Sequence, residues 1–184
     1  MDETGTPRVG GQDPEVRCTE SGRLLLRRPT SADLPDVFRI HGDPRTNQFN
    51  PDGPHVGVET SVALLDQWLD HWRTHGFGYW AVQPVSSAEV IGFAGLRHGR
   101  WLGRPVLNLY YRFAPQHWGS GYATETARYA VAWAAAHQPD LPVLARTTAD
   151  NVPSLRTALA AGLVRRPDLD GAERDVPMVV LASR

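Results

Sequence analysis

The sequence has little of what membrane, secreted and nucleic-acid-binding proteins usually carry. It contains one cysteine, Cys18, so no disulfide can form within the chain, and a reducing compartment is expected. No apolar run approaches the roughly 20 residues of a membrane-spanning helix, and residues 1–21 lack the apolar centre of a secretory signal. The formal net charge of -1 gives no general attraction to nucleic acid or anionic lipid. We therefore expect a cytoplasmic protein with no nucleic-acid or membrane partner.

The length of 184 residues favours one domain with its own core. Residues 1–21 mix glycine, proline and charge without periodicity, which predicts a disordered N-terminal arm. Residues 22–184 are then expected to form the folded domain.

Apolar patterning predicts strands alternating with helices. Strands are predicted at 24–26, 79–82, 90–96, 106–113, 143–148, 163–165 and 177–181, and helices at 31–41, 59–75, 122–137 and 152–161. A helix connects 106–113 to 143–148, so these two strands are expected to be parallel. The prediction is an α/β domain with a mixed sheet. Turns are expected at 84–89 and 98–105, and residues 43–58 form a long loop of the kind that is functional or mobile.

A glycine-containing loop between a predicted strand and a predicted helix is the main candidate site. Gly119 and Gly121 lie between the apolar residues 106–113 and the Ala-rich residues 122–137. Glycine lets the backbone take positive φ and approach a ligand closely, and free N–H groups at a helix start attract anions. The loop therefore predicts a phosphate site, with a plain helix start as the alternative. It is neither a P-loop nor a Rossmann fingerprint, because it lacks Gly-Lys-Ser/Thr and a third glycine.

The stretch from Asn108 to Glu125 resembles the acyl-CoA-binding motif of the GNAT superfamily of N-acetyltransferases, R/Q-x-x-G-x-G/A, which residues 118–123 fill. Trp118 followed by G-x-G-Y-A-T-E is similar to the RimJ/RimL-like branch, the ribosomal-protein N-acetyltransferases. Further matches occur in the family's order at Gly42-Asp43-Pro44, at Gly76 to Val82 and at Asn151-x-x-Ser154. The resemblance covers about residues 23–184. It implies the acyl-CoA N-acyltransferase fold, a central mixed sheet flanked by helices in which two parallel strands splay apart.

The resemblance also implies where the cosubstrate acetyl-CoA binds. The backbone of Tyr111, Arg112 and Phe113 would bond the pantetheine arm as if it were an added strand. The pyrophosphate would lie on Trp118, Gly119, Ser120, Gly121, Tyr122 and Ala123, with Thr124 adjacent. Asn151 would bond the pantetheine from the neighbouring strand's end, and the thioester would lie between the splayed strands.

The reaction that the resemblance implies is direct attack of a neutral primary amine on the acetyl thioester. A backbone N–H of the central strand would hold the developing oxyanion. Ser154 is the candidate donor of a proton or hydrogen bond to the departing sulfur, and its alternative role is to cap the start of its helix.

The general base is where the sequence departs from the family. Relatives often carry glutamate at the positions of Asn108 and Arg146, and some carry a tyrosine at Ala158. Asparagine and arginine cannot accept a proton at neutral pH. The remaining hypotheses are a water chain or one of His98, Glu59 and Asp43, or a slow enzyme.

Other candidates concern the acceptor amine. Trp80 and Tyr110 are candidate substrate-binding residues, with a core position as the alternative, and Tyr110 and Tyr111 must face opposite sides of their strand. Acids at 168–175 either attract a cationic amine or are simply solvated. Glu125 is expected to favour the helix dipole. The histidines are spread along the chain, so no metal is expected.

Two hypotheses from different classes follow. The first is an acetyl-CoA-dependent N-acetyltransferase acting on a primary amine, either a protein N-terminus or a small molecule. The second is a CoA-binding module that has lost catalysis and acts as a sensor or interaction domain, which the missing carboxylate at Asn108 and Arg146 favours. The sequence leaves open whether the protein forms a homodimer.

Overall fold

The computed structural model describes residues 16–19 and 21–183. The strands are β1 Val16–Cys18, β2 Leu24–Arg27, β3 Tyr79–Pro84, β4 Gly92–Trp101, β5 Arg104–Phe113, β6 Val143–Thr147, β7 Val164–Arg165, β8 Gly171–Glu173 and β9 Val176–Ala182. The α-helices are α1 Leu34–His41, α2 Val58–His75, α3 Tyr122–His137 and α4 Val152–Ala160. Short 3₁₀ turns lie at η1 Ser31–Asp33, η2 Pro44–Asn47, η3 Pro115–His117 and η4 Pro167–Leu169.

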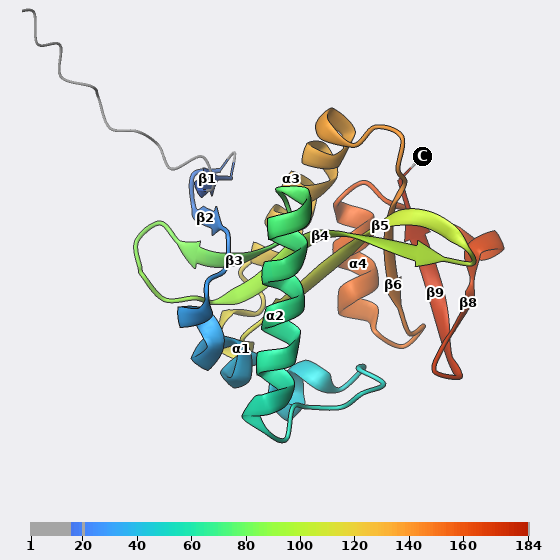
Figure 1. The fold of residues 1–184 in the computed structure, drawn as a ribbon. Coiled ribbons are helices and arrows are strands. Elements are labelled where there is room, and N and C mark those ends of the chain that lie inside the picture. The colour runs from blue at the N-terminus through green and yellow to red at the C-terminus, as the bar shows by residue number, and fades with distance from the viewer. Residues whose placement is uncertain (1–15, 20, 184) are drawn as a thin grey trace, which may run out of the picture.

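The strands form one mixed sheet in the order β1-β2-β3-β4-β5-β6-β9-β7, and β8 pairs with β9 (Figure 1). Every pairing is antiparallel except that of β5 with β6, which is parallel as predicted. The parallel pairing follows from the connection, because α3 carries the chain back before β6 begins.

Helices cover both faces of this sheet, and side-chain alternation along the strands decides what meets them. On one face, Tyr79, Phe93 and Tyr110 pack with residues of α1 and α2 such as Val37 and Trp68. On the other face the core includes these residues of the strands and of α3 and α4: Trp80, Leu107, Leu109, Ala127, Ala130 and Ala158. The alanines of α3 let that helix lie close to the sheet. Tyr110 and Tyr111 therefore face opposite sides, as predicted.

Three predicted features needed correction. The turn placed at 98–105 is only Leu102-Gly103, both with positive φ (47° and 76°), so β4 and β5 form one long hairpin that includes His98. The polar loop before the last strand contains the short strand β8. Part of the predicted arm is ordered, because β1 pairs with β2. The rest of that arm, residues 1–15 and residue 20, lies outside the described residues.

The predicted loop at 43–58 is held in place by side-chain hydrogen bonds. Asn47 is buried, and its amide nitrogen donates to the carbonyls of His41 and Asp43 at 2.7 and 2.9 Å. Asn50 donates to the carbonyl of Gly53 at 2.8 Å. These bonds give residues 43–53 a defined path beside the sheet.

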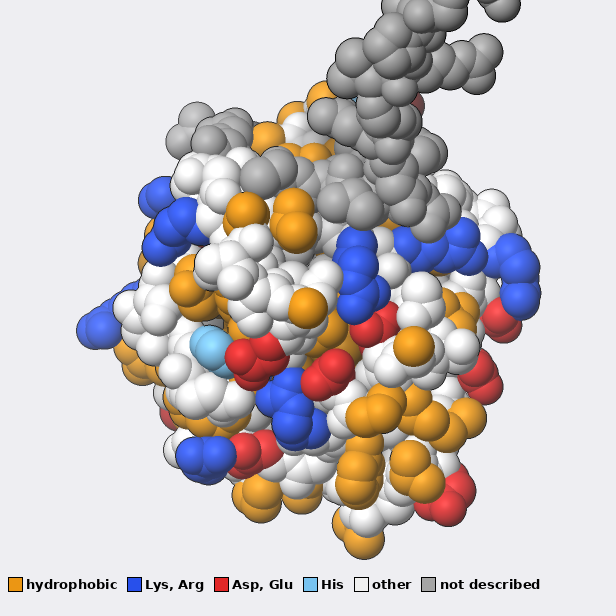
Figure 2. Space-filling view, turned by 90° about the vertical axis from the view of Figure 1, so that its left-hand side faces the viewer, with side chains coloured by type: hydrophobic (Ala, Val, Ile, Leu, Met, Phe, Trp, Pro, Cys, Tyr) orange, Lys and Arg blue, Asp and Glu red, His pale blue; other side chains and the backbone are white. Residues whose placement is uncertain are grey.

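The described part of the chain contains no helix long and apolar enough to cross a membrane. The face shown in Figure 2 carries basic, acidic and hydrophobic side chains interspersed, in keeping with the net charge of -1.

Candidate functional site

A cavity of about 740 Å³ opens where β5 and β6 part. The two strands pair only at Leu107 with Val143 and at Asn108 with Leu144. Beyond these pairs, residues 109–113 of β5 and 145–147 of β6 line opposite walls of the cavity. The start of α3, the start of α4, residues 45–46 and 48–52, and residues 173, 174 and 178 of the β8–β9 hairpin also line it. The predicted splay of the two parallel strands is therefore present and encloses space.

The glycine loop forms one end of this cavity. Gly119 and Gly121 have φ values of 76° and 79°, the left-handed region that favours glycine. A Cβ would meet nothing within 4 Å at Gly119 and only the Arg23 guanidinium, at 3.9 Å, at Gly121. Among the described residues, the N–H groups from Gly119 to Thr124 have no hydrogen-bond partner. The loop thus offers uncovered donors at the positive end of a 16-residue helix, which fits a phosphate group.

Glu125 secures this loop from behind. Its carboxylate accepts hydrogen bonds from Thr19 and Ser21 and forms an ion pair with Arg23. Arg23 also lies over the Tyr122 ring, 5.3 Å from the centroid. Burial alone would raise the pKa of Glu125, but these hydrogen bonds and the charge of Arg23 lower it. The structure thus gives Glu125 a second role beside its place at the helix dipole: it joins α3 to the N-terminal strands.

Asn151, Ser154 and Tyr111 meet at the start of α4. The Asn151 side-chain oxygen accepts from the Ser154 N–H at 3.3 Å, which caps the helix. The Tyr111 hydroxyl donates to the Ser154 carbonyl at 2.9 Å and lies 3.0 Å from the Ser154 Oγ. Burial raises the pKa of Tyr111 to about 12. The phenol therefore keeps its proton at neutral pH, and Ser154 lies in the cavity wall beside a permanent hydrogen-bonding group.

Tyr110 is fixed on the other face of β5. Its hydroxyl lies 2.7 Å from Nε2 of the buried His41, whose Nδ1 lies 2.9 Å from the Val37 carbonyl. A carbonyl only accepts, so Nδ1 carries the proton and Nε2 accepts from Tyr110. Burial is the main cause that lowers the pKa of His41 to about 3 and raises that of Tyr110 to about 12. Both groups stay neutral, and the tyrosine ring is held against the cavity.

Asn108 and Arg146 occupy the closed end of the strand gap. Arg146 donates to the Asn108 oxygen at 3.0 Å, and the Asn108 amide donates to the Tyr79 hydroxyl at 2.8 Å. Arg146 also pairs with Glu173 at 3.3 Å and lies over the Trp101 ring at 4.7 Å. The positions where relatives often carry glutamate are thus joined by a hydrogen bond, and neither side chain can accept a proton.

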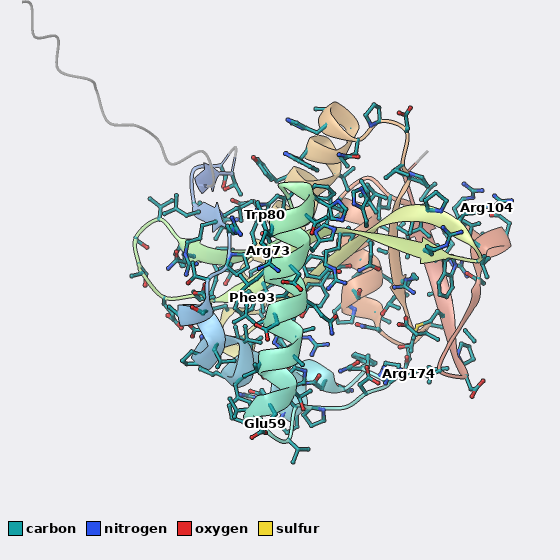
Figure 3. The ribbon with its side chains drawn as sticks, in the orientation of Figure 1. Glu59, Arg73, Trp80, Phe93, Arg104 and Arg174 are labelled. Carbon is teal, nitrogen blue, oxygen red and sulfur yellow. The ribbon has the colours of Figure 1, made fainter. Side chains whose placement is uncertain are left out.

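Most of the predicted site residues line this one cavity. They are Tyr110, Tyr111, Arg112, Phe113, Trp118, Gly119, Gly121, Tyr122, Ala123, Thr124, Asn151 and Ser154. Ser120 is exposed beside it. Trp80 is 1% exposed and packs against Tyr129 in the core on the α3 side, so it lies away from the cavity (Figure 3). The hypothetical bases Glu59, Asp43 and His98 are not among the lining residues either.

Two further parts of the cavity wall come from stretches that the sequence indicated only in general terms. The predicted functional or mobile loop contributes Phe49 and Asp52, and the β8 hairpin contributes Glu173, one of the acids at 168–175, together with Arg174. Arg174 forms an ion pair with Asp52, which joins these two parts of the wall. The length of the first loop was a usable sign that it belongs to a functional site. The pairing of its Asp52 with Arg174, far away in the sequence, depends on the tertiary fold.

Three histidines that the sequence analysis treated as scattered meet elsewhere. His71 and His75, four residues apart on α2, lie with His98 of β4 so that one nitrogen of each is within 4.8 Å of the others. His71 and His75 form a His-x-x-x-His pair that is already present in the sequence, so the expectation of scattered histidines was wrong. Both nitrogens of His71 are occupied, because Nδ1 donates to the Phe77 carbonyl at 2.8 Å and Nε2 accepts from the His98 N–H at 3.1 Å. Burial lowers the pKa of His71 to about 4. A metal would have to displace the His98 bond, and the absence of a metal stays a prediction.

Comparisons with known proteins point to one family. A family model described as an acetyltransferase (GNAT) domain matches residues 23–164. An acetyltransferase from Agrobacterium tumefaciens superposes with a TM-score of 0.78 at 23% identity, covering 98% of this chain and 99% of that one. For RimL, the ribosomal L7/L12 alpha-N-protein acetyltransferase solved with coenzyme A, the TM-score is 0.72 at 14% identity, with 92% and 97% covered.

A third structure is spermidine N-acetyltransferase from Vibrio cholerae in complex with CoA and spermine. Its TM-score is 0.68 at 14% identity, with 88% of this chain and 95% of that chain covered. The chain spans 33% and 64% of the length of two curated Bacillus subtilis relatives that it matches, the second of which is named as an uncharacterized N-acetyltransferase. At these identities the solved structures show a shared fold.

Proposed function

Because the chain belongs to the GNAT acetyltransferase family, we propose that it is an N-acetyltransferase of the RimJ/RimL-like branch that transfers an acetyl group from acetyl-CoA to a primary amine. The observation that carries the proposal is the cavity between β5 and β6. The glycine loop forms one of its ends, and Ser154 and Tyr111 form part of its wall. We further propose a cytoplasmic location.

The residues of the cavity fit acetyl-CoA. The uncovered N–H groups of residues 119–124 would hold the pyrophosphate, since they lie at the positive end of α3. The β5 backbone at 111–113 faces the widening gap and would bond the pantetheine arm, with Asn151 on the opposite side. Bound acetyl-CoA would supply the acetyl group as a thioester, which is activated toward an amine.

The protein's part in the transfer is to place donors where charge develops. A backbone N–H of β5 beside the gap would stabilise the carbonyl oxygen as it becomes negative. Ser154 would turn its hydroxyl proton from the Tyr111 oxygen, 3.0 Å away, toward the departing sulfur, while donation from Tyr111 to the Ser154 carbonyl at 2.9 Å holds the start of α4 in place. The bond that forms is N–C, and the bond that breaks is C–S.

Removal of the amine proton needs a different group. Asn108 and Arg146 do not accept protons, and the histidine that lines the cavity, His117, lies 3.2 Å from Glu89. Two carboxylates also line the described wall, those of Asp52 and Glu173. We propose that water in the cavity carries the proton to one of them.

The acceptor class is a protein N-terminus or a small-molecule amine. RimL and the Vibrio cholerae enzyme are named for one of each kind, a ribosomal protein and spermidine. The shared fold supports both for this chain and does not choose between them.

The test is release of free CoA thiol from acetyl-CoA with a panel of peptide N-termini and small amines, followed by mass measurement of the product. We expect amine-dependent thiol release and a product heavier by one acetyl group. Binding of acetyl-CoA, seen by calorimetry, without turnover on the whole panel would support the alternative, a CoA-binding module that acts as a sensor. Failure to bind acetyl-CoA would remove the basis of both.

A further inference from the structure

The charges that line the cavity are unequal in number. Among the described residues the lining includes four arginines and two carboxylates: Arg45, Arg112, Arg146, Arg174, Asp52 and Glu173. A cavity with an excess of one sign concentrates ligand groups of the opposite sign.

Both carboxylates of the lining already have arginine partners. Asp52 forms an ion pair with Arg174, and Glu173 lies 3.3 Å from Arg146. Arg45 is paired outside the lining, with Asp43 at 2.6 Å. These pairs account for three of the four guanidinium groups.

Arg112 is the arginine left over. It is half-buried on β5, and one of its NH groups donates to the Asn47 side-chain oxygen at 2.6 Å. No carboxylate of the described residues forms an ion pair with it. Its guanidinium lies 5.9 Å from the Tyr110 ring centroid, on the face of the sheet that carries α1 and α2. Burial lowers the pKa of the adjacent His55, and the charge of Arg112 lowers it further.

The Arg112 guanidinium can still bind an anion from the cavity side. A guanidinium has five N–H donors in a rigid fork that matches the two oxygens of a carboxylate. One donor is used by Asn47, whose own amide is held by the carbonyls of His41 and Asp43. The fork is therefore fixed in position before any ligand arrives, which lowers the entropy lost on binding.

Two of the acids that the sequence offered as an attraction for cations lie outside the cavity lining. Asp168 pairs with Arg166 at 2.7 Å, and Asp170 pairs with Arg165. A third, Glu173, lines the cavity, but its charge is balanced by Arg146, which stands where relatives often carry a glutamate on β6. An acceptor with a second ammonium group would therefore meet no unpaired carboxylate in the described wall and would meet the charge of Arg112.

We propose that the acceptor carries a carboxylate near its amine, and that Arg112 binds this carboxylate. The inference rests on the proposed acetyl transfer and names its substrate class. The chemistry is shared by a free amino acid and by a peptide N-terminus with an acidic second residue. Polyamines carry no carboxylate, so they do not belong to this substrate class.

The experiment compares matched acceptors with the full chain and acetyl-CoA. The pairs are phenylalanine with phenylalaninamide and a Ser-Asp peptide with a Ser-Asn peptide, with spermidine as the polycationic probe. Rates are expressed per neutral amine, so that differences in amine basicity do not enter. We expect kcat/KM to be 10- to 100-fold higher for the carboxylate member of at least one pair, the range of one charge-assisted hydrogen bond, and the responding pair identifies the source.

The variant Arg112→Gln should remove this preference, and Arg112→Lys should keep part of it. The matched control is Arg104→Gln, at the exposed tip of the β4–β5 hairpin away from the cavity (Figure 3). Retained acetyl-CoA affinity shows that Arg112→Gln still folds.

Equal use of both members, a preference for spermidine, or an unchanged preference in Arg112→Gln would overturn the inference and leave acetyl transfer intact. No turnover with any amine would overturn the proposed function and the inference with it.

Discussion

Gly121 allows the sharpest test of the glycine loop, because the chain offers a matched control. Its backbone angles are φ 79° and ψ 3°, and those of Gly76 at the end of α2 are φ 71° and ψ 7°. An alanine Cβ would meet only Arg23 at 3.9 Å in the first case and nothing within 4 Å in the second. The two substitutions therefore impose the same backbone strain, about 1–2 kcal/mol. Of these two glycines, only Gly121 lines the cavity.

We expect Gly121→Ala and Gly76→Ala to lower the melting temperature alike, by about 2–4 °C for each kcal/mol in a domain of this size. Relief of the strain at residue 121 would turn the neighbouring N–H groups away from the ligand. Loss of one hydrogen bond to a charged group costs about 1.5–3 kcal/mol, so acetyl-CoA affinity should fall about 10- to 100-fold. Gly76→Ala should leave the affinity as in the wild type.

The assays are thermal unfolding without ligand and calorimetric titration with acetyl-CoA. Wild-type affinity in Gly121→Ala, with the melting temperature lowered as expected, would refute the assignment of the loop as the phosphate site. An equal loss of affinity in Gly76→Ala would show that strain anywhere in the domain weakens binding.

Three further predictions test other parts of the structure. Ser154→Ala should lower kcat about 10- to 100-fold with acetyl-CoA affinity nearly unchanged if the serine serves the departing thiol, and equal kcat would leave it a helix cap. In the folded protein the pKa of His41 is about 3, against an ordinary value of 6.5. Between these two pH values the imidazole therefore binds a proton only in the unfolded chain. The contribution of His41 to the free energy of unfolding should fall by about 2 kcal/mol from pH 8 to pH 5. In denaturant titrations, His41→Gln should reduce the difference in unfolding free energy between pH 8 and pH 5 by about 2 kcal/mol. The control Val37→Ala should lower the unfolding free energy equally at both pH values. An unchanged difference in His41→Gln would contradict a neutral imidazole in the folded protein. Glu125→Gln should speed amide hydrogen exchange in β1 by weakening the hold on Thr19, and unchanged exchange would mean that sheet pairing alone secures β1.

The extent to which the sequence predicted the molecule depended on the range of the interactions involved. The α3 helix, its glycine start and the parallel β5–β6 pair follow from local pattern and from chain connectivity, and they were predicted correctly. The β4–β5 turn was predicted too long because Leu102 takes a positive φ that a leucine rarely adopts, which lets the two strands join in a two-residue turn.

Features that depend on distant residues were out of reach. The pairing of Asp52 with Arg174 and the carboxylate of Glu173 in the cavity wall both require the β8 hairpin to fold over the loop at 45–52. Trp80 was offered for the acceptor pocket because strand alternation alone does not say which face meets the cavity. Trp80 lies on the face of the sheet opposite to that of Tyr110, where it is buried in the core.

The central claim is that the gap between β5 and β6 holds the acetyl thioester, and a crystal structure of the protein with acetyl-CoA tests it most directly. In that structure we expect pyrophosphate oxygens within hydrogen-bond distance of the backbone N–H groups of residues 119–124. We also expect the pantetheine beside residues 111–113 and the sulfur near the Ser154 hydroxyl. Acetyl-CoA bound outside this gap, or bound with its thioester away from Ser154 and Tyr110, would contradict it.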